Sequence, residues 1–299
     1  MRILVTGRLG QIAVALSQVR LDDGMDLVLV GRPEFELTSE TSIRECIRAV
    51  APDVVVNAAA YTGVDLAESE VGLAHRINGW AAGVVADAAA SQGAAVLQLS
   101  TDYVFDGLKS TPYVEDDPVS PQNVYGHSKL AGERAVAAAN PRHVIVRTSW
   151  VYAPFGANFV RTMLQLASSK DEIQVVDDQI GSPTYAPDLA DALIGIARRV
   201  GDRARSVPAD HWGTFHIAGA GETSWAGMAE RVFAGSAARG GPCSRVRRIE
   251  STDYPTAAAR PANSRLDCRR LQEVYGLLLP EWRDSLELCL DAMPPGDAA

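Results

Sequence analysis

Short apolar segments alternate with amphipathic helical patterns through the first half of the chain, and this alternation restricts the possible folds more than any other feature. The segments expected to be strands, several of them apolar throughout, are residues 3–6, 27–30, 54–57, 96–99 and 144–147. Helical spacing of apolar residues occurs at residues 11–19, 41–50, 77–91 and 125–139. Buried strands that alternate with helices predict an α/β fold with a doubly wound parallel sheet, whose ligand lies at the carboxyl ends of its strands.

The alternation weakens after residue 150. Helical spacing continues at residues 158–169 and 187–200, and a last helix is expected near residues 281–293. Residues 214–218 are expected to return to the sheet as a strand. Residues 235–265 are rich in Gly, Pro and Arg, which predicts an irregular lobe closing over the sheet.

Composition excludes several classes of protein. A chain of 299 residues with 47% hydrophobic content can bury a large core, and a formal net charge of −9 argues against nucleic acid or an anionic membrane as the main partner. Four scattered cysteines without a Cys-x-x-Cys pair predict neither a disulfide framework nor a zinc site. Because a strand pattern begins at the N-terminus and no apolar run reaches the ~20 residues of a membrane span, we expect a cytoplasmic protein with a small-molecule ligand.

The first expected strand runs directly into a glycine-rich turn, Gly7-Arg8-Leu9-Gly10-Gln11-Ile12-Ala13. Gly7 and Gly10 allow the backbone to approach a pyrophosphate above a helix N-terminus, and the dinucleotide fingerprint accepts alanine at its third position, here Ala13. A lone Gly-x-x-Gly is about as often a plain tight turn. Its place after the first strand of a βαβ unit favours a dinucleotide cofactor and a Rossmann-type sheet.

The end of the second expected strand bears on the choice of dinucleotide. An acidic residue there hydrogen-bonds the adenosine ribose of NAD, but this chain has Gly31-Arg32. Arg32, helped by Arg8, can accommodate a 2′-phosphate, which favours NADPH, with NADH as the alternative. A solvated surface arginine would leave the cofactor preference open.

Tyr125 and Lys129 are four residues apart in an expected helix and therefore share one face. A free phenol, with a pKa of about 10, is a poor proton donor and acceptor at neutral pH unless a nearby cation stabilises the phenolate. Taken alone, such a pair is more often an exposed pair on an amphipathic helix. Thr101 and Asp102, which follow the fourth expected strand, place a hydroxyl and a carboxylate at the same edge of the sheet and favour a catalytic site.

These features resemble the extended short-chain dehydrogenase/reductases and, among them, most closely the dTDP-4-dehydrorhamnose reductases. The glycine turn and the Tyr-Lys pair are typical of the whole superfamily. More specific segments extend the resemblance over nearly the whole chain: residues 52–62, 64–68, 100–107, 125–133, 147–152, 178–184 and 260–267.

The resemblance implies a role for each site residue. Tyr125 would protonate the substrate carbonyl oxygen, Lys129 would bind the nicotinamide ribose and lower the pKa of Tyr125, and Thr101 would hydrogen-bond the same oxygen. The residues expected at the cofactor are Gly7, Gly10, Gln11, Ile12, Arg32, Glu36, Leu37, Ala60, Tyr61, Thr62, Leu99, Tyr125 and Lys129. Those expected at the substrate are Thr101, Asp102, Tyr125, Trp150, Asn158 and Arg260, with Asn158 and Arg260 facing the nucleotide diphosphate.

The implied reaction is reduction of the ketone of dTDP-4-dehydro-L-rhamnose to dTDP-L-rhamnose, for cell-wall or surface polysaccharide. A related sugar-nucleotide 4,6-dehydratase has an Asp-Glu pair after the equivalent threonine, whereas Tyr103 follows Asp102 here, which favours simple reduction. Two alternatives stay open. One is another sugar-nucleotide reductase or epimerase, and the other is a non-catalytic regulatory subunit resembling the methionine adenosyltransferase β subunit.

Some members of this family are associated with Mg²⁺ held by glutamates at a dimer contact. Ala15 and Pro187 occupy the corresponding positions here, so the sequence supports no metal site, and a monomer or weak homodimer is expected.

The expected division places an NAD(P)-binding Rossmann core at residues 1–155 and a smaller, discontinuous substrate-binding lobe mainly at residues 156–299. Later segments are expected to return to the core near residues 158–170, 187–200 and 214–219. The tail, residues 294–299, is expected to be disordered.

Overall fold

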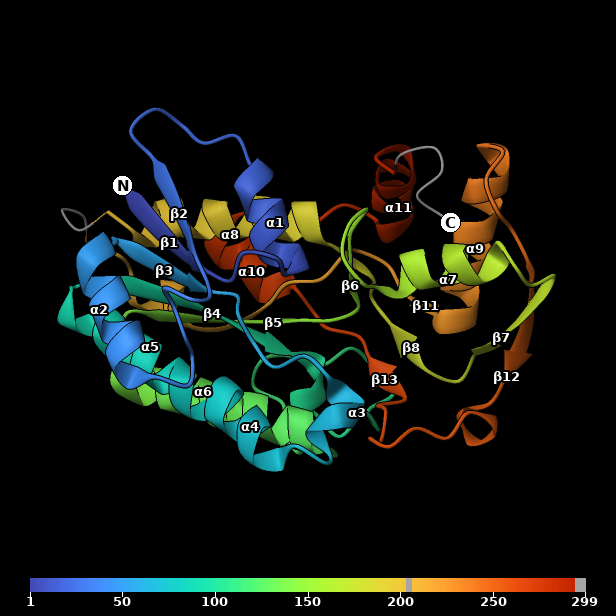
Figure 1. The fold of residues 1–299 in the computed structure, drawn as a ribbon, viewed down its shortest axis with the longest axis horizontal. Helices are drawn as coiled ribbons and strands as arrows, with labels where there is room; N and C mark the ends of the chain where they lie inside the picture. The colour runs from blue at the N-terminus through green and yellow to red at the C-terminus, as the bar shows by residue number, and fades with distance from the viewer. Residues whose placement is uncertain (203–205, 294–299) are drawn as a thin grey trace.

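The computed structural model describes residues 1–202 and 206–293, so the tail expected to be disordered lies outside the described residues. The described chain forms a six-stranded parallel sheet in the order β10-β5-β4-β3-β1-β2 (Figure 1). Its strands are β1 (Arg2–Thr6), β2 (Asp26–Val30), β3 (Val54–Asn57), β4 (Ala95–Thr101), β5 (His143–Thr148) and β10 (Gly213–His216). The predicted α/β fold with a doubly wound parallel sheet is confirmed.

Helices cover both faces of the sheet because successive strand side chains point to opposite sides. Ile3, Val5 and Val54 pack with one set of helices, α1 (Gln11–Gln18), α8 (Ala186–Val200) and α10 (Arg269–Tyr275). Leu4 and Val55 pack with the other set, α2 (Glu40–Val50), α5 (Ala81–Ser91) and α6 (Val124–Ala139). Two apolar cores therefore hold the sheet rigid between them.

The direction of strand addition reverses at β1, which has β2 on one side and β3 on the other. Ligands of doubly wound sheets bind in the crevice at such a reversal, outside the carboxyl ends of the strands. The glycine turn after β1 and the Ala58–Ala60 segment after β3 flank this crevice.

A buried network of hydrogen-bonded polar side chains connects β1, β3 and β4 near their carboxyl ends. The Thr6 hydroxyl donates to Asn57 Oδ1 at 2.7 Å, and Asn57 Nδ2 donates to Gln98 Oε1 at 2.7 Å. The Ala59 amide N–H donates to Thr6 Oγ1 at 3.0 Å. Because each of these buried polar side chains has a hydrogen-bond partner, the network fixes β1, β3 and β4 relative to one another.

The helix expected at residues 77–91 begins with a π-helical turn, η1 (Arg76–Trp80), that continues into α5. It follows two short helices, α3 (Val64–Ala67) and α4 (Val71–His75). Small residues bring α6 very close to this turn: a Cβ on Gly132 would lie 2.1 Å from the carbonyl oxygen of Asn78.

A second region with its own apolar core lies beyond the sheet, on the right of Figure 1. It contains α7 (Phe159–Ala167), α9 (Trp225–Ala238) and α11 (Trp282–Asp291), together with β7 (Glu172–Val176) and β12 (Arg245–Ile249). Two small sheets of two-residue strands accompany these elements. One pairs β6 (Val151–Tyr152) with β9 (Thr184–Tyr185), and the other has the order β11 (Thr223–Ser224), β8 (Ile180–Gly181), β13 (Asn263–Ser264). Single 3₁₀ turns are η2 (Asp102–Val104), η3 (Ala209–His211) and η4 (Ser251–Asp253).

Two expectations about the second half are corrected. Residues 235–265 are not irregular throughout, because β12 lies among them and pairs in parallel with β7 from Arg245 opposite Glu172. Residues 158–170 do not return to the sheet, because Val160 and Leu164 of α7 lie in the core of the second region. The segments expected at 187–200 and 214–219 do lie on the sheet, as α8 and β10.

Candidate active site

Tyr125 stands in the first turn of α6, beside the turn that follows β4. The cap of this helix is Asn123, whose Oδ1 accepts the Gly126 N–H at 2.8 Å. A Cβ on Gly126 would lie 2.3 Å from the carbonyl oxygen of Tyr103, so only glycine permits this approach. As a result the rings of Tyr103 and Tyr125 meet edge to face, with centroids 5.6 Å apart.

The surroundings of Tyr125 hold its phenol protonated. Burial, and then the charge of Asp102, raise the pKa of Tyr125 to about 12, while a hydrogen bond with the Thr101 side chain opposes that shift. Thr101 Oγ1 donates to Asp102 Oδ1 at 3.0 Å, and burial raises the pKa of Asp102 to about 6. The structure thus brings Thr101, Asp102 and Tyr125 together as a hydroxyl, a carboxyl and a phenol in one site.

Lys129 lies one turn further along the same face of α6 and is only 4% exposed. Its ammonium Nζ donates to the Leu99 carbonyl oxygen of β4 at 2.6 Å. Burial lowers the pKa of Lys129 to about 8, and the charge of Glu133 partly offsets the loss. A cation therefore lies one helical turn from Tyr125 along α6, as the spacing predicts. The lowering of the Tyr125 pKa that the resemblance implies is not found, because that pKa is raised and Lys129 is not among the causes of its shift.

The glycine turn fits the pyrophosphate of a dinucleotide. Gly7 adopts a positive φ of 97°, and a Cβ there would lie 3.6 Å from Cβ of Ala59 on the opposite side of the crevice. Gly10 is the N-cap of α1 without a side-chain cap, and no described atom lies within 4 Å of where its Cβ would be. The open first-turn amides of α1 are suited to a phosphate.

Asn78 links the loop after β3 to the helix that carries Tyr125. Its Oδ1 accepts the Tyr61 N–H at 2.8 Å, and its Nδ2 donates to Tyr61 O at 3.0 Å and to Ser128 Oγ at 2.9 Å. The Ser128 hydroxyl in turn donates to the Tyr125 carbonyl oxygen at 2.7 Å. Sequence reasoning missed Asn78, although an Asn-Gly pair inside a helical pattern is an unfavourable choice that marks a special position.

The expected adenosine residues lie at the end of β2. Arg8 forms an ion pair with Glu34 at 2.9 Å, and Arg32 forms one with Glu36 at 3.1 Å. The stem of Arg8 crosses Gly31, and its Cγ lies 3.2 Å from where a Cβ of Gly31 would be. Both guanidinium groups are substantially exposed, so their carboxylate partners are exchangeable for another anion.

Two of the residues expected at the substrate, Trp150 and Arg260, lie in different surroundings. Trp150 has a positive φ of 49° and stacks on Trp225 with ring centroids 3.5 Å apart, and a Cβ on Gly181 would lie 2.4 Å from its ring. Arg260 forms an ion pair with Asp65 at 2.6 Å.

Asn158 has a different environment from Arg260. Its Oδ1 accepts the Arg161 N–H as the cap of α7, and its Nδ2 donates to Gln11 Oε1 at 3.0 Å and to Ala153 O at 2.9 Å. The structure therefore places Asn158 beside the glycine turn, and it shares none of its described hydrogen-bond partners with Arg260.

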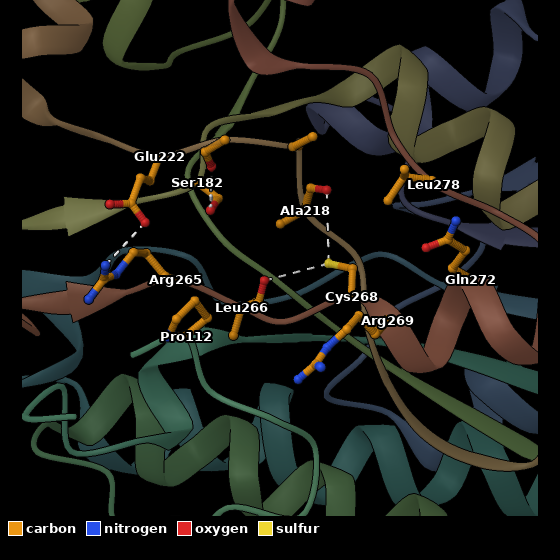
Figure 2. A pocket seen from close by; sticks show the side chains of 13 residues that line it. Pro112, Ser182, Ala218, Glu222, Arg265, Leu266, Cys268, Arg269, Gln272 and Leu278 are labelled. Atoms are coloured by element: carbon orange, nitrogen blue, oxygen red, sulfur yellow. Dashed lines mark hydrogen bonds and ion pairs between the residues drawn. The ribbon is translucent and has the colours of Figure 1, made fainter. Parts of the chain in front are cut away.

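A separate pocket of about 260 Å³ lies between the segment after β10 and the start of α10 (Figure 2). Its polar wall includes Arg265, which pairs with Glu222 at 3.1 Å, and Cys268, whose thiol faces the carbonyl oxygens of Ala218 and Leu266. The residues expected at the cofactor and the sugar are not among those that line it.

Within the described ranges, no three or more His, Cys, Asp and Glu side chains gather in a way that could hold a metal ion. Ala15 is buried in the core, and Pro187 lies in the first turn of α8. None of the helices in the described part of the chain is both long and apolar enough to cross a membrane.

The fold and the site together define a class of protein. A doubly wound sheet with a glycine turn after β1, and a Tyr-x-x-x-Lys pair on the helix beside the end of β4, belong to the short-chain dehydrogenases/reductases of the extended type. A family model described as the RmlD substrate binding domain matches residues 1–294. The chain belongs to this family, that of the dTDP-4-dehydrorhamnose reductases.

Named relatives match over nearly the whole chain. A dTDP-4-dehydrorhamnose reductase from Sinorhizobium fredii is 49% identical over 286 residues, 95% of each chain. The crystal structure of one from Clostridium acetobutylicum is 35% identical, with a TM-score of 0.90 over 97% of this chain and 99% of that one. Another from Bacillus anthracis, solved in complex with NADP, is 33% identical, with a TM-score of 0.88 over 97% and 98%.

Proposed function

We propose that the chain reduces the ketone of dTDP-4-dehydro-L-rhamnose with NADPH to give dTDP-L-rhamnose, for cell-wall or surface polysaccharide. The observation that carries this proposal is the contact of Tyr125 with Thr101, one helical turn from the buried ammonium of Lys129. The names of the relatives identify the sugar, because the reductases match along 95% or more of the chain.

Thr101, Tyr125 and Lys129 each have a distinct role in the proposed reduction. The Thr101 and Tyr125 hydroxyls hold the carbonyl oxygen, and Tyr125 donates its proton to that oxygen as the carbonyl carbon accepts a hydride. The Lys129 ammonium stabilises the phenolate that remains, which takes its next proton from solvent. NADPH, when bound, supplies the hydride and is oxidised to NADP⁺.

The cofactor would be held along the crevice at β1 and β3. Gly7, Gly10 and the start of α1, Gln11 and Ile12, would receive the pyrophosphate. Ala60, Tyr61, Thr62 and Leu99 would line the ribose side. Arg8 and Arg32 would exchange their glutamate partners for the 2′-phosphate, with Glu36 and Leu37 near the adenosine. The relative solved with NADP supports this choice.

The sugar nucleotide would lie across both regions of the molecule. Asp102 and Trp150 would contact the sugar, and Arg260 would receive the diphosphate, which competes with Asp65 for the guanidinium. The hydrogen bond of Asn158 with Gln11 supports a place for Asn158 on the cofactor side, instead of the expected place at the nucleotide diphosphate. The proposed domains are a cofactor core at residues 1–155 and a substrate lobe mainly at residues 156–299.

The proposed setting is the reducing cytoplasm, which suits cysteines that are all free thiols. We expect a monomer or weak homodimer that binds neither nucleic acid nor membrane. Mg²⁺ is a possible ligand, but Ala15 and Pro187 stand where the carboxylates that would hold it are expected. Gel filtration with light scattering, with and without EDTA, checks the oligomeric state and whether it depends on Mg²⁺.

A direct assay tests the function. Purified protein is mixed with NADPH and dTDP-4-dehydro-L-rhamnose, and the absorbance of the reduced nicotinamide is followed. Substrate-dependent oxidation supports the proposal, and its absence removes it. The epimerase and regulatory-subunit alternatives both predict no net oxidation.

A further inference from the structure

A buried ion pair lies directly behind the catalytic residues. Arg147 of β5 holds the Glu133 carboxylate with two hydrogen bonds, Nε to Oε1 at 2.9 Å and Nη2 to Oε2 at 2.7 Å. The Ser100 hydroxyl of β4 donates to the same Oε1. Glu133, Arg147 and Ser100 are each only about 4–5% exposed, so water cannot replace these partners.

The ion pair is connected to the site through both α6 and β4. Glu133 is four residues after Lys129, on the same face of the helix. Lys129 donates to the carbonyl oxygen of Leu99, Ser100 is the next residue of β4, and Thr101 is the one after. Two side chains of α6 therefore form hydrogen bonds with two consecutive residues of β4, Leu99 and Ser100. The next residue is Thr101, whose hydroxyl contacts Tyr125.

We infer that Glu133 is a positioning residue for the proposed reduction: clamped by Arg147 and Ser100, its carboxylate holds the Lys129 ammonium against β4 and keeps it charged. This inference rests on the proposed function. The expected direction of the pH effect follows from the charges: loss of the Glu133 carboxylate removes an attraction that favours the charged form of Lys129, so the ammonium loses its proton at lower pH.

The other titratable groups of this buried region are few. Tyr125 lies on α6, Asp102 lies in the turn after β4, and both are part of the site. On the strand next to Arg147, the backbone N–H of His216 donates to the Glu115 carboxylate at 2.9 Å. Burial and the Arg147 charge lower the pKa of His216 to about 3, so His216 stays neutral above pH 5.

The test compares kcat and KM across pH for wild type, Glu133→Gln and Glu133→Asp, with NADPH binding followed separately by its fluorescence. We expect the alkaline fall of kcat in Glu133→Gln to move at least about one pH unit lower, with little change in the sugar KM. NADPH affinity should weaken at the same lower pH. Glu133→Asp should move the alkaline fall of kcat and the loss of NADPH affinity back toward the pH values of the wild type.

Controls separate the possible failures. Glu230→Gln breaks an exposed arginine pair with Arg248 and should leave the profile unchanged. If Glu133→Gln does not fold, Glu133→Gln with Arg147→Met removes both buried charges and should still move the alkaline fall to lower pH. An unmoved profile in the folded variant overturns the inference, whereas an inactive wild type overturns the proposed function instead.

Discussion

At the scale of single residues, the site depends on groups that burial shifts away from their ordinary behaviour. The phenol of Tyr125 is a weaker acid than usual before ligands bind, and the ammonium of Lys129 is a stronger one. The two shifts move the pKa values of Tyr125 and Lys129 apart, from 10.0 and 10.5 to about 12 and about 8. At neutral pH the phenol therefore keeps the proton that a carbonyl oxygen would receive, while Lys129 carries the positive charge.

Replacing Tyr125 with Phe tests the proton donor. The variant keeps the ring and its edge contact with Tyr103 but loses the hydroxyl, so kcat should fall about 10²- to 10⁴-fold while NADPH affinity is unchanged. Tyr254→Phe, at an exposed position, is the matched control. Full activity in Tyr125→Phe would mean that another group protonates the sugar.

The pH dependence of the wild type follows from Lys129. Since burial lowers its pKa from 10.5 to about 8, the ammonium is present at neutral pH and is lost as the pH rises through about 8. We therefore expect kcat to be highest near neutral pH and to fall above pH 8. A rate that stays constant up to pH 10 would contradict this role for Lys129.

Arg32 determines the cofactor in this account. Arg32→Ala should lower the ratio of kcat/KM for NADPH to that for NADH about tenfold. The variant loses its contact with the 2′-phosphate of NADPH, and NADH has no such phosphate. Arg48→Ala is the control, since Arg48 lies in the last turn of α2, near the amino end of β3 and away from the carboxyl ends of the strands. An unchanged ratio would exclude Arg32 from the choice.

At the scale of elements, the packing of α6 against η1 fixes the catalytic helix. Gly132→Ala would place a methyl group 2.1 Å from the Asn78 carbonyl oxygen, so we expect it to lower the free energy of unfolding by about 1–3 kcal/mol. Gly72→Ala in α4 meets no described atom within 4 Å and serves as the control in urea titrations. Equal stability of the two variants would show that α6 can shift freely.

The sequence predicted those elements whose apolar period is strong. β3 and β4 are buried at every residue, and α2 carries Ile43 and Ile47 on one face, so their patterns were clear. The pattern failed for β12, where Arg245, Arg247 and Arg248 make a strand look like a loop. Its partner, β7, lies far away in sequence, and such pairing leaves no local signal.

At the scale of the whole molecule, the site combines segments that only the fold brings together. Trp150 follows β5 and stacks on Trp225 of α9, and Arg260 pairs with Asp65 of α3. Motifs in the sequence predicted Trp150 and Arg260, but not Trp225, Asn78 or the clamp on Glu133. These three act through tertiary contacts, which the spacing of residues does not reveal.

The central claim is that the chain transfers a hydride from NADPH to the sugar ketone while Tyr125 donates the proton. The most direct measurement uses NADPH with deuterium at nicotinamide carbon 4, in each of its two stereochemical forms, and mass spectrometry of the sugar nucleotide. We predict that one form, and only one, places a single deuterium on the carbon that was the ketone. A sugar that is unchanged or unlabelled with both forms would contradict the account.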